Sequence, residues 1–302
     1  MSLRKFCVPA SIAVAIASVF LLAVHGLNFG IDFKGGSLFE VRSKSGPIQV
    51  AELRERLGKL GLGDVQIQGL DTPQEALIRV EQQKATEGVS GEVAQQAAAA
   101  KVQKALGDTI EIRRAEVVGP SVSGELKQAG IIAVLCAIIG ILLYIWFRFE
   151  WQFSLAAILA LVHDITITLG LFSLLDMEFG LTEVAALLTL AGYSINDTVV
   201  VFDRIRENLR RYKKMPLLQL LNKSINETMS RTVLTSVTTL LAIFSIYIYG
   251  TEVIKGFAFA MLFGILIGTW SSIFVATPFL KWIGVKRDWS GNDTKAPAGA
   301  QV

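Results

Sequence analysis

Residues 181–202 read LTEVAALLTLAGYSINDTVVVF, an apolar run that carries Asn196 and Asp197 in its second half. A run of about 20 apolar residues is long enough to cross a bilayer as one helix. Placing a carboxylate at membrane depth costs about 3 kcal/mol on insertion scales, so such groups usually face a polar path and serve function. The stretch therefore predicts a membrane protein that carries or uses an ion.

The composition of the whole chain supports a membrane protein. Of its 302 residues 52% are hydrophobic and 18% are charged, and the mean hydropathy is +0.50. The net charge of +3 is small and scattered, which excludes a nucleic-acid partner. Cys7 and Cys136 lie in apolar runs, which excludes a disulfide framework. The sequence has no metal-site spacing, nucleophile–base pair or phosphate loop, so neither a cofactor nor hydrolytic chemistry is expected.

Apolar runs of spanning length occur six times, at residues 6–27, 129–147, 153–175, 181–202, 232–249 and 256–282. The first run resembles a signal peptide. It exceeds a typical signal core of about 7–15 residues and has no clean cleavage site, so we expect it to stay as a helix. The fold class is thus a polytopic α-helical membrane protein with six transmembrane helices. Residues 1–27 form the first helix and residues 129–282 form a five-helix bundle.

Lysine and arginine predict the orientation, because they favour the cytoplasmic ends of spans. If six spans alternate, the basic residues before the first span, at Arg148, in 204–231 and in 281–287 share one side. Both termini are therefore expected in the cytoplasm, with residues 283–302 as a disordered tail. We expect segment 203–231 to be a basic cytoplasmic loop that lies on the inner membrane surface, with contact to a cytoplasmic partner as the alternative.

Residues 28–128 are left on the periplasmic side, which is enough for one small domain. Period-two alternation predicts strands at 37–42, 64–70, 75–81 and 109–118, while helical patterns follow Pro47 and cover 91–106. The order β-α-β-β-α-β is that of a small α+β ferredoxin-like domain. Such a sheet often carries binding surfaces and says little about chemistry.

The candidate ion site centres on Asp197. Arg231, at the start of the next span, is a partner of opposite charge, and a contact that forms and breaks would couple proton binding to a shape change. The alternative is a static pair. Asn196 orients the carboxylate or simply joins helices. Asp164 is either a second relay carboxylate or a structural acceptor. Because adjacent helical residues point about 100° apart, His163 and Asp164 are not expected to form one site.

Two rows of small or hydroxyl-bearing residues have open alternatives. Small residues at every fourth position of the sixth span suit close packing, either within the bundle or against a partner subunit. Hydroxyls on one side of the fifth span suit a hydrated path or hydrogen bonds to the helix backbone. The two rows are Gly256, Ala260, Gly264, Gly268, Ser272 and Ala276, and Thr232, Thr235, Ser236 and Thr239.

Several stretches, taken together, resemble the SecF branch of the SecD/SecF family. They are GIDFKGG at 30–36, VGPSVSGEL at 118–126, LVHDI at 161–165, GYSINDTVVVFDRIRE at 192–207, and Arg231-Thr232 opening the hydroxyl row. The resemblance covers nearly the whole chain before its tail. Asp32 is expected to cap a turn, and a residue smaller than Phe202 is expected at that position. The family signature residues are Gly30, Asp32, Gly35, Gly36, Gly119 and Pro120.

The resemblance implies a half-transporter of the resistance-nodulation-division superfamily in the bacterial inner membrane. Such a subunit works with SecD and uses the proton-motive force to promote late steps of protein export. Asp197 matches the family's membrane aspartate and Arg231 its basic partner, with Asn196 and Asp164 in support. The implied partners are a SecD-like subunit, the SecYEG translocon, the unfolded preprotein, YajC and the lipid bilayer.

Two other functions stay open at this point. The chain could be the exporter half of a drug or lipid transporter of the same superfamily, although that function favours a larger outer domain. It could also be a passive scaffold or assembly factor, in which buried polar groups only fix helix packing. We do not expect an enzyme. One carboxylate serves H⁺ or Na⁺ equally well, so the sequence leaves the coupling ion open.

Overall fold

The computed structural model describes residues 4–285 apart from 71, 84 and 86–88. Most of the predicted tail at 283–302 lies outside the described residues. The chain divides into two compact units, each described here by itself. A helical unit comprises Met1–Gly26, Ala137–Asp176 and Ala185–Val302, and an α/β unit comprises Leu27–Cys136 and Met177–Val184.

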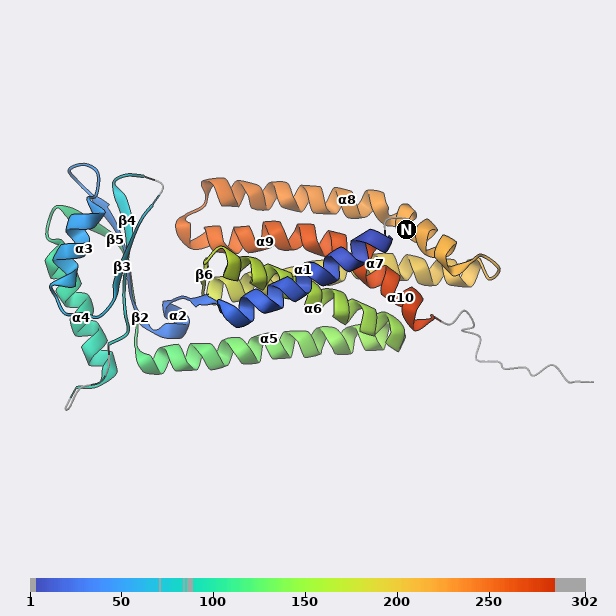
Figure 1. Ribbon diagram of the computed structural model, residues 1–302, viewed down its shortest axis with the longest axis horizontal. Coiled ribbons are helices and arrows are strands. Elements are labelled where there is room, and N and C mark those ends of the chain that lie inside the picture. Colours follow the sequence, from blue (N-terminus) through green and yellow to red (C-terminus); the bar gives the residue numbers. More distant parts are fainter. Residues whose placement is uncertain (1–3, 71, 84, 86–88, 286–302) are drawn as a thin grey trace, which may run out of the picture. The chain divides into compact units, whose positions relative to one another are not determined.

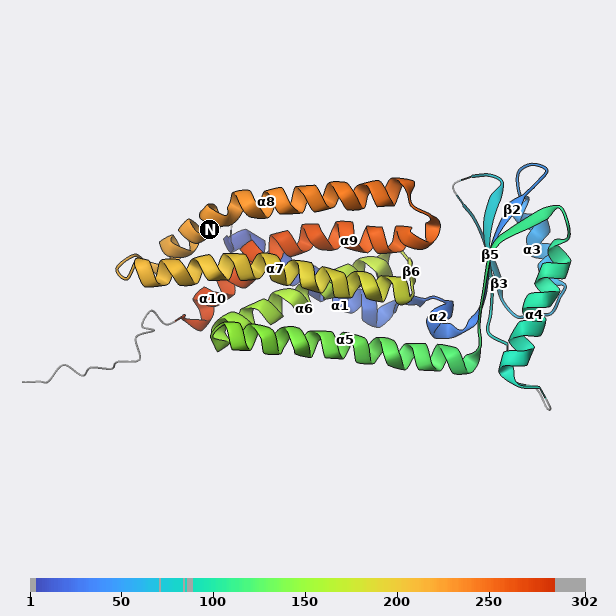
Figure 2. The ribbon, with the colours of Figure 1, turned by 180° about the vertical axis from the view of Figure 1, so that it is seen from behind.

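Within the described residues, six helices are long and apolar enough to cross a membrane, which confirms the predicted six spans. The sixth is interrupted by one π-helical turn, η1. Helices α8 and α9 lie side by side in both views (Figure 1 and Figure 2). The elements are α1 (Arg4–Val24), α5 (Pro120–Arg148), α6 (Trp151–Leu174), α7 (Leu181–Arg211), α8 (Leu217–Tyr249), α9 (Glu252–Ser271), η1 (Ser272–Ala276) and α10 (Thr277–Ile283).

Several helices extend beyond their predicted apolar runs. Helix α5 begins at Pro120 rather than at residue 129. Helix α7 continues through Arg211 and α8 begins at Leu217, so the segment 203–231, predicted as a loop, is helical except for a turn at 212–216. Hydropathy detects only the apolar part of a helix, whereas the backbone hydrogen bonds continue into polar sequence that still favours a helix.

The α/β unit contains a four-stranded antiparallel sheet in the order β3-β4-β2-β5. Helices α3 and α4 cover one face of this sheet (Figure 1). The chain order of these elements is the predicted β-α-β-β-α-β, which confirms the ferredoxin-like fold class. The elements are β2 (Gly36–Ser43), α3 (Val50–Gly58), β3 (Val65–Gly69), β4 (Glu75–Val80), α4 (Gly91–Leu106) and β5 (Ile110–Val118).

Alternation along the strands places one set of apolar side chains between the sheet and its two helices. Phe39, Leu57 and Ile78 are fully buried there. Burying each of these side chains contributes about 2 kcal/mol to folding. Helix α4 starts at the Ser90 hydroxyl, which accepts a hydrogen bond from the N–H of Val93. The sequence pattern thus defines both the core and the helix boundary.

Three short elements complete the α/β unit: β1 (Asn28–Phe29), α2 (Ile31–Lys34) and β6 (Glu178–Phe179). Strands β1 and β6 pair in parallel although they are far apart in the chain. The rings of Phe29, Phe33 and Phe179 pack on one another, with centroids 5.8–6.3 Å apart. This aromatic contact holds the segment after α1 against the segment before α7.

An aromatic cluster stabilises the helical unit at the Arg148 end of α5 and the start of α6. The Phe202 ring centroid lies 5.3 Å from that of Phe153 and 6.4 Å from that of Phe149. Phe202 is fully buried. The resemblance predicts a smaller residue at this position; here the ring fills core space between α6 and α7.

The small residues of α9 are used within this chain. A Cβ atom added at Gly264 would lie 2.6 Å from Leu190 Cδ1, and one added at Gly268 would lie 3.2 Å from Ser194 Cβ. Both neighbours belong to α7. Ala260, Ser272 and Ala276 are also buried. The alternative of packing inside the bundle is therefore the one observed along this row.

Replacing Gly264 with alanine should destabilise the helical unit, because the added methyl group overlaps the side chain of Leu190, which is fully buried and would have to shift within the packed bundle. Overpacking of this kind costs about 1–3 kcal/mol. Gly192→Ala is the matched control, since nothing lies within 4 Å of the methyl group it adds to α7. Denaturant unfolding in detergent micelles should give a lower midpoint for Gly264→Ala only. An unchanged midpoint would contradict the close approach of α9 to α7.

Candidate functional site

Asp197 is buried in the helical unit and is held by two hydroxyl groups. The Thr232 hydroxyl of α8 donates to Asp197 Oδ1 at 2.6 Å, and the Ser272 hydroxyl of η1 donates to Oδ2 at 2.8 Å. The aspartate is 7% exposed. Both carboxylate oxygens thus have a donor, which offsets part of the cost of removing the charge from water.

Asp164 on α6 is the second buried carboxylate and is completely shielded from solvent. Its Oδ2 atom accepts hydrogen bonds from the Ser194 hydroxyl at 2.6 Å and the Ser271 hydroxyl at 2.7 Å. These donors come from α7 and α9, so three helices meet at this carboxylate. The same chemistry therefore recurs at both aspartates: a carboxylate with hydroxyl donors from neighbouring helices.

His163 lies against Asp164, which corrects the prediction that these two residues form no common site. His163 Nδ1 is 2.9 Å from Asp164 Oδ1. The expected separation of about 100° describes only the directions in which the side chains leave the helix. The long imidazole bends back far enough to reach its neighbour. Its other nitrogen, Nε2, is buried and has no hydrogen-bond partner among the described residues.

The π-helical turn brings the two carboxylates into one polar system. Ser271 and Ser272 are consecutive, yet the first donates to Asp164 and the second to Asp197. Pro278 follows, and since it has no N–H, the carbonyl four residues before it loses its helical donor. Widening of a helix into a π turn is one response to such a break and is frequent at functional sites. The Thr277 hydroxyl donates to the Ser272 carbonyl at 2.9 Å within this turn.

The structure does not bring all predicted site residues together. Arg231 is exposed, and no ion pair joins it to Asp197 in the described part of the chain. Its charge still interacts favourably with that carboxylate through space. Asn196 is exposed as well, because it neighbours Asp197 and so points to another side of α7. The direct contacts of Asp197 are instead hydroxyl groups.

The hydroxyl row of α8 divides between the two alternatives given above. Thr232 and Ser236 are buried, and the Ser236 hydroxyl lies 2.8 Å from that of Thr269 on α9. Thr235 and Thr239 instead donate to backbone carbonyls of their own helix. Within this row Thr232 contacts Asp197 and Ser236 contacts α9, whereas Thr235 and Thr239 form hydrogen bonds within α8.

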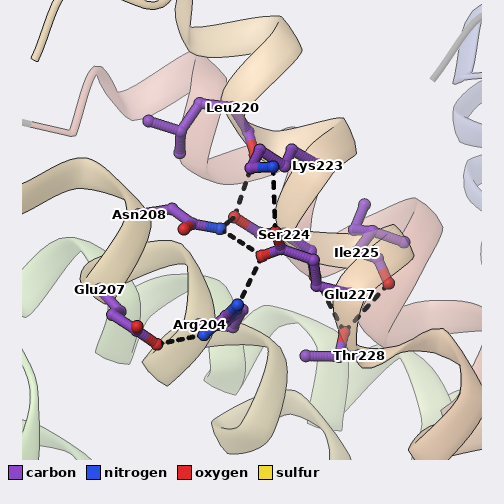
Figure 3. A network of polar contacts seen from close by, with 9 residues as sticks. All are labelled: Arg204, Glu207, Asn208, Leu220, Lys223, Ser224, Ile225, Glu227 and Thr228. Carbon is purple, nitrogen blue, oxygen red and sulfur yellow. Dashed lines mark hydrogen bonds and ion pairs between the residues drawn. The ribbon is translucent and has the colours of Figure 1, made fainter. Parts of the chain in front are cut away.

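A polar network joins the ends of α7 and α8 next to the turn at 212–216 (Figure 3). Asn208, which is 1% exposed, donates to Ser224 Oγ at 2.9 Å and to Glu227 Oε2 at 2.8 Å. Arg204 Nε donates to the same Glu227 oxygen at 2.7 Å, and Lys223 Nζ lies 3.2 Å from the other. Glu227 is thus the shared acceptor of three donors.

This network fixes the register of two antiparallel helices. Thr232 meets Asp197, Glu227 meets Arg204 and Asn208. The α7 partners Asp197, Arg204 and Asn208 follow one another toward the turn, and their α8 partners Thr232, Glu227 and Ser224 follow in the reverse order, as two antiparallel helices require. The contacts of Glu227 with α7 thereby help to position the Thr232 hydroxyl, which donates to Asp197. We call these contacts the α7–α8 ladder.

Two signature residues, Gly30 and Asp32, lie next to β6 in the α/β unit. The Asp32 carboxylate accepts the backbone N–H of Leu181 at 2.8 Å, so it caps the start of α7. A Cβ atom at Gly30 would lie 2.7 Å from Glu178 Oε1, and one at Gly180 would lie 2.7 Å from Asp32 Oδ2. Asp32 therefore has a capping role, and Gly30 leaves room for the Glu178 carboxylate close to its backbone.

The remaining signature residues shape turns. Gly35 and Gly36 have φ of 73° and 132°, a region that favours glycine. Pro120 begins α5, and Gly119 before it packs against Glu92, with 3.0 Å from an added Cβ to Glu92 Cγ. These residues support the backbone path on either side of the sheet and do not touch the buried carboxylates, which belong to the other unit.

A partly buried ion pair links the sheet to the segment before α7. Arg79 of β4 donates to Glu178 of β6. Burial raises the pKa of Glu178, and the arginine beside it opposes that shift. Sequence reasoning missed this pair, because the two residues lie almost a hundred positions apart and neither belongs to a motif. No cluster of three His, Cys, Asp or Glu suited to a metal ion occurs among the described residues.

Comparisons with known proteins identify the family of the chain. The model for the C-terminal part of the protein export membrane protein SecD/SecF matches residues 98–286, and that for the SecD/SecF GG motif matches residues 20–46. The chain belongs to the SecD/SecF family. It is 49% identical to the protein translocase subunit SecF of Rhodobacter capsulatus, over 94% of this chain and 88% of that protein. It is 48% identical to SecF of Magnetococcus marinus, over 92% and 89%.

Longer SecDF chains also match. The crystal structure of SecDF, a translocon-associated membrane protein from Thermus thermophilus, has a TM-score of 0.82 and 35% identity, covering 94% of this chain and 38% of that chain. The SecDF protein of Brucella abortus is 41% identical over 95% of this chain and 37% of its own length. Within the SecD/SecF family, this chain therefore resembles the SecF proteins over most of their length and one part of each SecDF chain.

Replacing Asn208 with aspartate should destabilise the α7–α8 ladder, because it removes a buried donor and places a second carboxylate beside Glu227. The buried Ser224 oxygen loses the donor that the Asn208 amide supplied, and a lost donor of this kind costs about 1–3 kcal/mol. Asn226→Asp, at an exposed site on α8, is the matched control. The penalty should shrink at low pH, where a protonated carboxyl can donate as the amide did. Thermal unfolding at pH 7 and pH 4 tests both statements; equal stability of the two variants at pH 7 would contradict the ladder.

Proposed function

We propose that this chain acts as the SecF subunit of a bacterial protein-export complex and that an ion gradient acts on it through Asp197. The observation that supports this most is the polar system formed by Asp164, Ser271, Ser272 and Asp197 inside a spanning bundle. Two carboxylates at membrane depth are costly, and a fold that keeps both usually uses them.

The chemistry of this polar system suits proton transfer. A serine hydroxyl both donates and accepts. When Asp197 takes up a proton, the Ser272 hydroxyl can reverse its hydrogen bond and accept from the new acid. The hydrogen bond between Asp197 on α7 and Ser272 on η1 then changes in strength, while the two residues stay in contact. Release of the proton restores the original bond. Na⁺ would instead replace the hydrogen bonds and be coordinated by the same carboxylate and hydroxyl oxygens, with the hydroxyl hydrogens turned away from it. Imposed H⁺ and Na⁺ gradients distinguish the two ions.

The cellular setting is part of the same proposal. We place the protein in the bacterial inner membrane with both termini in the cytoplasm and residues 28–128 in the periplasm. We further propose association with a SecD-like subunit, supported by relatives in which SecD and SecF form one SecDF chain. The SecYEG translocon, YajC and the unfolded preprotein are the further proposed partners. Domain limits follow those given from the sequence, with 129–282 as the five-helix bundle.

Asp197→Asn should abolish gradient-stimulated export and leave membrane insertion and SecD binding intact. The amide keeps the shape of the carboxylate and can still meet Thr232 and Ser272, but it cannot exchange a proton. Export by SecD-containing vesicles should be measured with an imposed H⁺ gradient, an imposed Na⁺ gradient and neither. Equal stimulation of wild type and variant would remove Asp197 from the mechanism and favour a passive scaffold. Stimulation by Na⁺ alone would replace the proton.

Thr232→Val should reduce gradient-stimulated export several-fold, because Asp197 loses one of its two donors while the side-chain volume is preserved. Thr232→Ser is the matched control, since it keeps the hydroxyl and should keep most of the stimulation. Protein levels and SecD association are compared by quantitative immunoblot in the same vesicles. If valine and serine behave alike, the hydroxyl at this position does not take part in coupling.

A further inference from the structure

Strand β3 lies at an edge of the sheet and pairs only with β4. The hydrogen bonds that flank the pair reveal which backbone groups are used. The N–H of Leu70 donates to the Glu75 carbonyl, and the N–H of Glu81 donates to the Asp64 carbonyl, each at 3.1 Å. Along an antiparallel ladder such bonded residues alternate with residues that face the other way. The even-numbered residues of β3 therefore direct their backbone N–H and C=O groups toward β4.

The odd-numbered residues Val65, Ile67 and Gly69 consequently direct their N–H and C=O groups away from the sheet. One of these groups already serves as an acceptor, because the Arg54 guanidinium donates to the Ile67 carbonyl at 3.4 Å. In the described part of the chain no strand pairs with this edge. The edge thus presents an alternating row of donors and acceptors with the spacing of a β-strand.

A cavity of about 460 Å³ lies along this edge. A volume in this range accommodates a ligand of a few residues or the size of a small molecule. Four consecutive residues of β3 form part of its wall, so the cavity adjoins the free edge, and it extends from there over β4. Asp64, Arg54 of α3, and Leu77 and Arg79 of β4 complete the lining.

The opposite edge of the sheet differs in charge. Strand β5 carries Glu111, Arg113, Arg114 and Glu116 along its length, whereas β3 (VQIQG) carries no charged side chain. Charged residues on an edge strand discourage the addition of another strand. The two edges are therefore not equivalent: β5 is protected in the usual way, and β3 is short, neutral and bordered by a cavity.

We propose that the outer edge of β3 binds an extended polypeptide segment, which adds to the sheet as a further strand. The main-chain groups of Val65, Ile67 and Gly69 supply the hydrogen bonds, and the cavity receives alternate side chains of the segment. The inference rests on the proposed function, in which the chain handles unfolded protein. Because main-chain hydrogen bonds carry the contact, binding is tolerant of sequence, as a subunit serving many exported chains requires.

Gly69→Pro tests the proposal by removing a single backbone hydrogen-bond donor from the outer edge of β3. Proline removes the outward N–H of Gly69 and leaves the ladder to β4 intact, and edge strands are where proline is tolerated. Gly69→Ala is the matched control, because it keeps the N–H and nothing lies within 4 Å of the added Cβ. The full chain in nanodiscs is titrated with a fluorescent peptide of alternating threonine and valine, about ten residues long. We expect binding about tenfold weaker for proline and unchanged for alanine.

A cross-linking measurement covers the case in which proline disturbs the fold. A photoreactive phenylalanine analogue at Gln68 should capture the peptide, and the same analogue at Glu111 on β5 should not. Equal peptide binding by the wild type, Gly69→Pro and Gly69→Ala would overturn the proposal. Cross-linking of the peptide at position 111 alone would overturn it as well. Concentration-dependent dimerisation without peptide binding would overturn it in favour of a second copy on this edge. The assay needs no gradient, so its outcome is independent of the export measurements on Asp197→Asn.

Discussion

The cost of burying two carboxylates inside a spanning bundle is the constraint on which the helical unit depends. An ion removed from water without partners costs several kcal/mol, so each must be met by donors from elsewhere in the fold. Asp164 draws donors from α7 and α9, and Asp197 draws them from α8 and η1. The positions of four helices are therefore tied to two side chains, and the close packing of α9 on α7 through Gly264 follows from the same demand.

The π-helical turn explains how one helix serves both sites. In a regular α-helix, consecutive residues point about 100° apart and rarely reach two targets of the same kind. Ser271 and Ser272 do so at the start of a wider turn, which Pro278 favours by leaving a carbonyl without its donor. A change in either hydrogen bond therefore acts on a segment of the backbone that is already less constrained than the helix around it.

Local pattern predicted much of the fold, since a run of apolar residues and a period of two are properties of the chain itself. The six spans and the order of strands and helices along the outer domain followed from them. The contacts of Asp197 did not, because hydroxyl donors on other helices compete with the charged partner Arg231 and only tertiary packing decides between them. The contact of His163 with Asp164 escaped because the angle between adjacent helical residues ignores the reach of the side chains, and the Arg79–Glu178 pair escaped because its residues are far apart in the chain. The adjacent serines at 271 and 272, close to a proline in an apolar run, were the one signal available.

The α7–α8 ladder has a consequence for how this hairpin tolerates changes in length. Residues added to the turn at 212–216 lie beyond the last rung and leave every partner in place. A single residue inserted between Asp197 and Asn208 would rotate one end of α7 by about 100° relative to the other, so either the buried carboxylate or the rungs would lose their partners. We therefore expect related chains to vary in length at the turn and not between Asp197 and Asn208. The number of residues between these two positions is fixed by the partners that each must reach on other helices.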